Sequence, residues 1–249
     1  KGYRDGCQSD LREMVVLDHK NKTIRQLQID RDTMTSVNVL GLFGNNAGSR
    51  VMQICLSHGY GMDRQERCQN SLRAVEGLLN CPEIELYMEV PLDAISTLND
   101  LLGGVTVTLE DDFTAADPAM TKGATLTLTG EQAVTLVRRR MDVADGTNET
   151  RMTRQREFMD AAVPLIREKI NESSGFITTM IDTLTPYVTT NMVRGRMINE
   201  INRAYHYEVE PVQYLSGEHS IGEDGFVEFH ADEQSIVDFV LDAFYTKKE

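Results

Sequence analysis

Six of the chain's 25 Lys and Arg residues fall within 20 positions, in the segment VRRRMDVADGTNETRMTRQR that runs from Val137 to Arg156. Guanidinium groups bind phosphate and carboxylate oxygens through paired hydrogen bonds. The whole protein has a formal net charge of −14, so this cluster stands out against its composition. The acidic balance argues against a nucleic-acid binder, which needs an excess of positive charge. A local anion site remains compatible with it.

The spacing of these arginines suggests two groups. Arg151 and Arg154, with Gln155, share one face of the first turns of a predicted helix, where free N–H groups and the helix dipole also favour an anion. Arg138 to Arg140 end the preceding predicted helix. An alternative reading is an ordinary solvated face, on which the arginines pair with neighbouring acids and contribute little. Those acids are Asp142, Asp145 and Glu149.

Acidic residues occur at the ends of two predicted strands. Asp10 precedes the first strand, and Asp30 and Asp32 follow the second. If the strands pair antiparallel around the DHKNKT turn, these ends meet. Carboxylates beside phosphate oxygens are the usual way to hold Mg²⁺, and a carboxylate there could act as a general base for a hydroxyl. The alternative is that these are loop acids that cap turns.

Several other chemistries lack their motifs. The chain has no GxGxxG or Walker-type glycine loop and no G-x-S-x-G, and its five histidines are scattered singly. Arg, Asp and a hard cation are the groups used in phosphoryl or pyrophosphate chemistry. No run of 18 apolar residues is present. The chain begins at Lys1 without Met, so we expect that a signal peptide or anchor precedes it in a longer protein.

Strands and helices alternate along the chain, which predicts an α/β fold with a mixed sheet. Alternating or apolar runs predict strands at Met14–Leu17, Ile24–Ile29, 84–91, 105–112, 207–215 and 225–230. Apolar residues at helical spacing predict helices at Arg50–Leu56, Gln65–Leu79, 93–102, 175–187, 190–204 and Asp232–Tyr245. Two more helices frame the arginines, one capped by Thr129 and Gln132 and ending near Arg140, the other running from Thr150 to Asn171, with a possible kink at Pro164.

Four segments, in order from about residue 8 to 165, resemble the LytR-CpsA-Psr (LCP) family. SDLREMVVLDHKNKTIRQLQIDRDT resembles its Arg-Ser-Asp-Thr and Pro-Arg-Asp-Thr segments, and QICLSHGYG is similar to its Ile-Asn-x-Ala-Tyr-x-x-Gly-Gly segment. LLGGVTVTLEDDF resembles its Gly-Gly-Val strand. LTGEQAVTLVRRRMDVADGTNETRMTRQR resembles its Gly-Glu-Gln-Ala…Val-Arg-x-Arg…Arg-x-x-Arg-Gln hallmark.

The resemblance implies one extracytoplasmic catalytic domain over residues 1–249, with its motifs at about 8–170 and a C-terminal part that completes it. The implied fold is an α-β-α layered arrangement, with a mixed central sheet flanked by helices and an apolar groove for a lipid. The implied full-length protein has a single-pass N-terminal membrane anchor and acts at the outer face of the membrane or in the cell wall. Its implied activity is to move a teichoic-acid-like or capsular glycopolymer from a polyprenyl-pyrophosphate carrier to peptidoglycan.

The resemblance also implies roles for residues. Asp10 and Asp32 would hold Mg²⁺ (or Mn²⁺), and with Arg138 they would be catalytic. The residues expected to bind pyrophosphate are Arg31, Arg138, Arg140, Arg151, Arg154 and Gln155. Two alternatives remain: a polyprenyl-pyrophosphate hydrolase that uses water as acceptor, and a non-catalytic regulatory or binding module, in keeping with the attenuator label of the family.

The chain departs from the family pattern at four positions. Gln8 and Leu11 replace the Arg and Thr that flank the first Asp, Asp30 replaces the Pro before Arg-Asp, and Asn148 occupies a position that often holds Asp. Asn148 retains a carbonyl oxygen and loses the charge, which puts a metal contact there in doubt. The chain has four cysteines, at positions 7, 55, 68 and 81. A disulfide between Cys55 and Cys68, which flank the SHGYG loop, is a hypothesis.

Overall fold

The computed structural model describes residues 8–41, 43–140 and 142–245. These residues form two compact units. Unit 1 contains the described residues up to Met88 and those from Tyr207 onward, and unit 2 contains Glu89–His206. The chain therefore leaves unit 1, builds unit 2 and returns.

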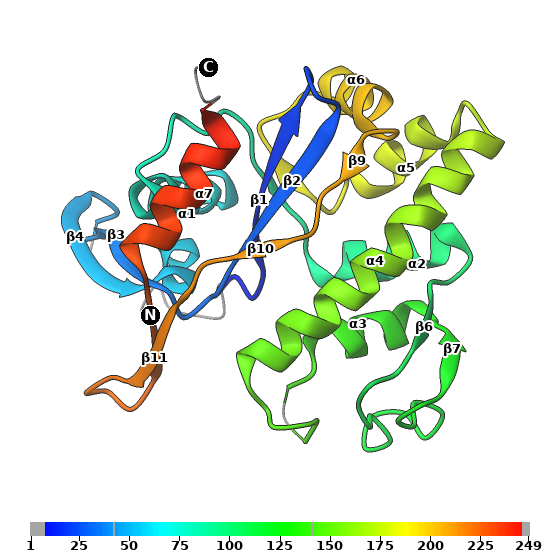
Figure 1. The fold of residues 1–249 in the computed structure, drawn as a ribbon, viewed down its shortest axis with the longest axis horizontal. Helices are drawn as coiled ribbons and strands as arrows, with labels where there is room; N and C mark the ends of the chain where they lie inside the picture. The colour runs from blue at the N-terminus through cyan, green and yellow to red at the C-terminus, as the bar shows by residue number, and fades with distance from the viewer. Residues whose placement is uncertain (1–7, 42, 141, 246–249) are drawn as a thin grey trace. The chain divides into compact units, whose positions relative to one another are not determined.

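Unit 1 is built on a mixed four-stranded sheet, which confirms the predicted α/β class with a mixed sheet. Strands β1 (Arg12–Asp18) and β2 (Thr23–Ile29) form an antiparallel hairpin in which Arg12 lies opposite Ile29. The C-terminal strands β9 (Glu208–Val209) and β10 (Gln213–Tyr214) run parallel to β2, as Figure 1 shows.

The other elements of unit 1 complete its core. They are β3 (Met34–Leu40), β4 (Asn46–Gln53), the 3₁₀ helix η1 (Ile54–Gly59), α1 (Arg64–Leu79), β11 (Gly217–Ile221), β12 (Val227–Ala231) and α7 (Glu233–Phe244). Leu27 and Ile29 of the sheet, Leu79 of α1 and Phe239 of α7 belong to one buried cluster. Burying such side chains stabilises the fold by roughly 1.5–3 kcal/mol each.

The helix predicted at Arg50–Leu56 is wrong. Residues 46–53 form strand β4, which pairs antiparallel with β3, and the helical turn begins only at Ile54. Most of β4 is exposed, so its side chains show no alternation of apolar and polar residues. Backbone pairing with β3 defines this strand, and that pairing leaves no local signal in the sequence.

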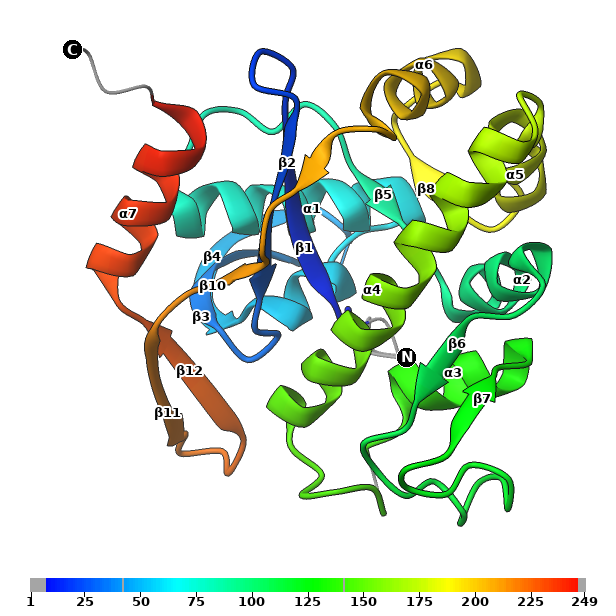
Figure 2. The same ribbon diagram turned by 45° about the vertical axis from the view of Figure 1, so that its right-hand side comes forward.

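Unit 2 is mainly helical. It contains α2 (Leu92–Leu102), β6 (Thr106–Thr108), β7 (Thr125–Thr127), α3 (Gly130–Arg138), α4 (Asn148–Glu172), α5 (Phe176–Leu184), β8 (Thr189–Thr190) and α6 (Arg194–Ala204). Figure 2 shows α4 as the longest of these helices, with α2 and α3 beside it. The strand predicted at 84–91 is reduced to β5 (Met88–Glu89) at the boundary of the units. Unit 2 has its own buried hydrophobic cluster, which includes Phe113, Leu136 and Phe158.

Caps define the two helices that frame the arginine segment. The predicted capping box is confirmed: the Thr129 N–H donates to Gln132 Oε1 (3.0 Å), and the Gln132 N–H donates to Thr129 Oγ1 (3.3 Å). Helix α4 begins at Asn148, two residues before the predicted start, because Thr147 is its N-cap. Asp145 accepts hydrogen bonds from Thr150 and Thr147, which lower its pKa to about 2.

Asn99 joins α2 to the β6–β7 hairpin. Its side chain is fully buried, donates to the Leu128 carbonyl (2.8 Å) and accepts from the Val105 N–H (3.0 Å). We expect Asn99→Ala to lower the free energy of unfolding by about 3 kcal/mol, because two buried backbone groups lose their partners. Urea unfolding of the whole chain measures the change.

Asn202→Ala is the matched control, because the exposed Asn202 donates only to the Ile198 carbonyl of its own helix. Its expected effect lies within about 0.5 kcal/mol. Equal effects of the two variants would contradict the role assigned to Asn99.

Candidate functional site

In unit 1, the predicted meeting of the acidic strand ends is confirmed. The antiparallel register of β1 and β2 places Asp10 beside the loop Asp30–Thr33 that follows β2. Arg31 forms an ion pair with Asp10 through Nη1, and its Nε lies 3.5 Å from Asp32 Oδ1. The two carboxylates therefore share one guanidinium. Side-chain exposure is 43% for Asp10 and 12% for Asp32, so Asp10 is the more accessible acid.

Four hydrogen bonds, each with at least one backbone group, fix the Asp30–Thr33 loop. The Asp32 N–H donates to Asp30 Oδ1 (2.8 Å), and Thr33 Oγ1 donates to the Asp30 carbonyl (2.6 Å). On the other side, the N–H groups of Ile54 and Cys55 in η1 donate to the carbonyls of Thr33 (2.7 Å) and Arg31 (3.0 Å). The loop is thus held from within and by η1, which gives Arg31 and Asp32 a defined orientation.

The structure adds two contacts at this end that the sequence did not predict. Cys55 Sγ lies 3.5 Å from Arg31 Nη2, and Gln53 Nε2 lies 3.4 Å from Asp32 Oδ1. Burial raises the pKa of the Cys55 thiol, although Arg31 acts in the opposite direction. Gln53 ends β4 and Cys55 lies in η1, in the segment where the sequence prediction failed. Gln8, one of the departures from the family pattern, accepts a hydrogen bond from Arg31 Nη2.

Arg12 is a further buried cation in unit 1. It is 8% exposed, its Nη2 donates to Ser57 Oγ (3.0 Å), and burial lowers its pKa to about 10. The alternation of the strand is a sequence signal for the burial of Arg12, because it puts Arg12 on the same face as the buried Met14.

The disulfide hypothesis is wrong for the described cysteines: Cys55, Cys68 and Cys81 are all free. Cys55 contacts Arg31 in place of another thiol, and burial raises its pKa. Cys7 lies outside the described residues.

In unit 2, three predicted pyrophosphate ligands lie on the first turns of α4 and are buried. Arg154, which is 2% exposed, donates to Asp111 Oδ2 (3.2 Å) and to the Arg139 carbonyl (2.6 Å). Its guanidinium carbon lies 5.3 Å from the centre of the Phe113 ring, within the range of a cation–π contact. Arg154 is thus anchored in the core between α4 and the end of α3.

Arg151 and Gln155 also contact their own surroundings. Arg151 Nη2 donates to Asn148 Oδ1 (2.7 Å), and Gln155 Nε2 donates to the Val137 carbonyl (3.1 Å). Nε of Arg154 and Oε1 of Gln155 are buried without a hydrogen-bond partner among the described residues. Arg154 and Gln155 therefore tie α4 to the C-terminal end of α3, whereas Arg151 bonds within α4.

Arg138 and Arg140 differ from this buried set. Arg138 is the last residue of α3 and is exposed, and Arg140 is half-exposed two residues later. Within the described part of the chain, neither side chain has a hydrogen bond or ion pair. The alternative in which Asp145 pairs with the arginines does not hold, because that carboxylate binds Thr147 and Thr150. The guanidinium groups of Arg138 and Arg140 are thus uncommitted among the described residues.

The unit 1 acids suit a cation that uses few protein ligands. No group of three or more His, Cys, Asp or Glu placed to hold a metal occurs among residues 8–41, 43–140 and 142–245. Mg²⁺ commonly takes one or two carboxylates and completes its shell with water and substrate phosphates. The carboxylates of Asp10 and Asp32, which converge on Arg31, match that donor set.

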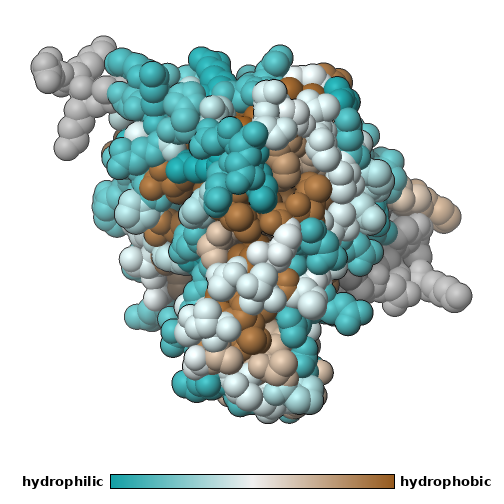
Figure 3. Space-filling model, turned by 90° about the vertical axis from the view of Figure 1, so that its right-hand side faces the viewer, coloured by the Kyte–Doolittle hydropathy of each residue, from teal (hydrophilic) through white to brown (hydrophobic). Residues whose placement is uncertain are grey.

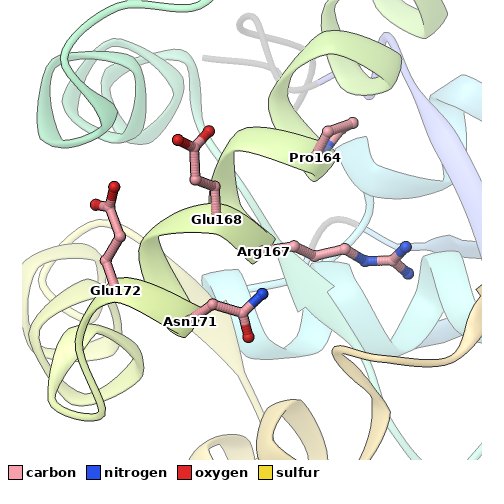
Figure 4. A pocket seen from close by; sticks show the side chains of 5 residues that line it. All are labelled: Pro164, Arg167, Glu168, Asn171 and Glu172. Carbon is pink, nitrogen blue, oxygen red and sulfur yellow. The ribbon is translucent and has the colours of Figure 1, made fainter.

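The predicted apolar lipid groove stays a prediction. A cavity of about 670 Å³ lies along α4, and its lining residues are Pro164, Arg167, Glu168, Asn171 and Glu172. Figure 4 shows Arg167 extending away from the side to which Glu168 and Glu172 point. Four of these five lining residues are polar or charged. Figure 3 shows hydrophobic surface gathered in a strip between hydrophilic residues on one face of the protein. Among the described helices, none has the length and apolar character needed to cross a membrane.

Comparison with known proteins agrees with the motifs. The model of the LytR_cpsA_psr family matches residues 4–240. A relative from Bacillus mycoides (strain KBAB4), the polyisoprenyl-teichoic acid–peptidoglycan teichoic acid transferase TagU, is 28% identical over 198 residues, which are 78% of this chain. This chain spans 58% of the length of that relative.

Two solved structures share the fold. Protein gbs0355 from Streptococcus agalactiae superposes with a TM-score of 0.79 at 19% identity, covering 100% of this chain and 85% of its own. TagT from B. subtilis superposes with a TM-score of 0.71 at 21% identity, covering 95% of this chain and 84% of its own. The family match extends over nearly all of both units, and the chain belongs to the LytR_cpsA_psr (LytR-CpsA-Psr) family.

Proposed function

We propose that this chain is the catalytic domain of a phosphotransferase that moves a glycopolymer from a polyprenyl-pyrophosphate carrier to peptidoglycan. The observation that carries the proposal is the Arg31 guanidinium with two carboxylates on it, in a member of a family whose relative TagU is named a teichoic acid transferase. The donor would be a teichoic-acid-like or capsular polymer. The reaction would take place at the outer face of the cell membrane, to which an N-terminal anchor would hold the full-length protein.

The step is a displacement at phosphorus. A hydroxyl of peptidoglycan attacks the phosphorus that carries the polymer, a new P–O bond forms, and the bond to the polyprenyl phosphate breaks. One of the two carboxylates, Asp10 or Asp32, takes the proton of the attacking hydroxyl. Polyprenyl phosphate leaves with the electron pair of the broken bond. Positioning and charge stabilisation account for most of the catalysis in such transfers.

The arginines would meet the charge of the pyrophosphate. The assignment of its oxygens to Arg31, Arg138 and Arg140 is a prediction from the family motifs. Arg154 and Gln155 contribute the buried contacts that hold the end of α3, and Arg151 bonds to Asn148 within α4. Asp10 and Asp32 would hold Mg²⁺ or Mn²⁺, which when bound neutralises charge on phosphate oxygens.

Substitution of the site residues tests this function. We expect Asp32→Asn and Arg138→Ala each to lower kcat/KM for transfer by about 100-fold or more, since each removes a charge that acts on the reacting group. The assay measures transfer of a polyprenyl-pyrophosphate-linked teichoic acid to peptidoglycan. Asp182→Asn and Arg194→Ala are matched controls, because those two residues form an exposed ion pair with each other, and they should retain activity.

The same assay separates the competing functions. Retained transfer in both Asp32→Asn and Arg138→Ala would refute the assigned site. Release of phosphate without polymer transfer would identify a hydrolase. Donor binding without turnover would identify a binding or regulatory module.

Removal of divalent cations tests the metal assignment. Treatment of the protein with a chelator should abolish transfer, and added Mg²⁺ should restore it, because the phosphate oxygens then regain their counter-charge. Calorimetric titration of the protein with Mg²⁺ gives a readout that needs no turnover. Asp10→Asn and Asp32→Asn should each weaken Mg²⁺ binding by about tenfold or more, whereas Asp182→Asn should leave it unchanged. Unaltered Mg²⁺ affinity in both site variants would exclude these ligands.

A further inference from the structure

The hairpin β11–β12 of unit 1 holds the loop that carries Arg31 and Asp32. The Phe229 N–H of β12 donates to the Asp32 carbonyl (2.9 Å). The Gln53 side chain donates both to the Val227 carbonyl of β12 (2.6 Å) and to Asp32 Oδ1 (3.4 Å). These contacts join residues nearly two hundred positions apart in the sequence, so the C-terminal part of the chain supports the N-terminal half of the site.

A histidine of β11 makes a third contact with this loop. His219 Nε2 lies 3.1 Å from Asp30 Oδ2, and its ring packs against Phe229 with centroids 4.7 Å apart. The other oxygen of Asp30 accepts the Asp32 N–H at 2.8 Å. A single carboxylate therefore links the β11 side chain to the backbone of Asp32. The Asp30 side chain is only 11% exposed, and a charge with so little access to water requires such partners.

We propose that His219 is a positioning residue of the transferase: through Asp30, it fixes the backbone of the loop that presents Arg31 and Asp32. This inference rests on the proposed function, in which those two residues act on the donor. It also gives Asp30 a role in this chain. The family pattern has proline at this position, whose ring fixes the backbone angle φ. Here a carboxylate with two hydrogen-bonded oxygens, one of them on β11, restrains the same segment.

Removal of such a positioning residue lowers kcat more than it changes KM. Asp32 and Arg31 remain present when His219 is removed, but the loop loses one restraint, and an error of about 1 Å in a reacting group can cost about 100-fold in rate. Supporting contacts of this kind typically contribute about 10- to 100-fold. We expect His219→Ala to lower kcat for transfer about tenfold and to change KM by less than about threefold.

The conservative variant and a control on the same hairpin sharpen the test. Glutamine can place an N–H donor near the position of the histidine Nε2, so His219→Gln should recover kcat to within about threefold of the wild type. His230 lies on the neighbouring strand β12 and bonds to Glu228 of that strand (3.1 Å). His230→Ala should therefore leave kcat unchanged. Urea unfolding of each variant shows whether unit 1 remains folded under the assay conditions.

A double-mutant cycle identifies the route through Asp30. If His219 acts through that carboxylate, Asp30→Ala combined with His219→Ala should lower kcat no further than Asp30→Ala alone. Independent, additive losses would overturn the inference, as would full activity of His219→Ala, or an equal loss in His219→Gln. Asp32→Asn in the same assay separates the two failures. If Asp32→Asn retains activity, the proposed site is wrong; if it is inactive while His219→Ala is fully active, only the positioning role fails.

Discussion

The ion pairs of Arg31 are the interaction on which the polar end of unit 1 depends. Antiparallel pairing of β1 and β2 brings Asp10 and Asp32 to one end of the hairpin, where two carboxylates would repel each other. The Arg31 guanidinium contacts both and is itself only 12% exposed, so it needs them in turn. The three groups carry a formal net charge of −1. That remaining negative charge is the electrostatic basis of the proposed cation site.

Unit 2 contains both buried and exposed arginines. The buried Arg154 holds the backbone that carries the exposed arginines. Arg154 bonds to the Arg139 carbonyl, and Gln155 bonds to the Val137 carbonyl, at the point where α3 ends. The carbonyls at a helix end lack partners within the helix. By filling them, these α4 side chains hold the segment from which Arg138 and Arg140 extend. The buried contacts thus hold the backbone that carries Arg138 and Arg140, two side chains without a partner among the described residues.

The parts of the structure that were predictable from sequence are those with a local signal. The β1–β2 hairpin, the Thr129 capping box and the long α4 follow from alternation, capping residues and helical spacing. The fold of residues 46–59 did not, because β4 is defined by pairing with β3 and is largely exposed. The contacts of Gln53, Cys55 and His219 with the Asp30–Thr33 loop were missed for the same reason. They depend on which segments meet in space, and a single sequence records this only through recognised family motifs.

The contacts of Asn148 show how the structure accommodates a departure from the family pattern. As the first residue of α4, it is 8% exposed, and its Oδ1 accepts a hydrogen bond from Arg151 Nη2. Its Nδ2 lies 3.2 Å from Met152 Sδ. An aspartate would retain the acceptor but would place a second oxygen beside that sulfur and add a charge to a buried position. The amide satisfies both neighbours without a charge. Asn148 is therefore better explained as an anchor for Arg151 than as a weakened metal ligand.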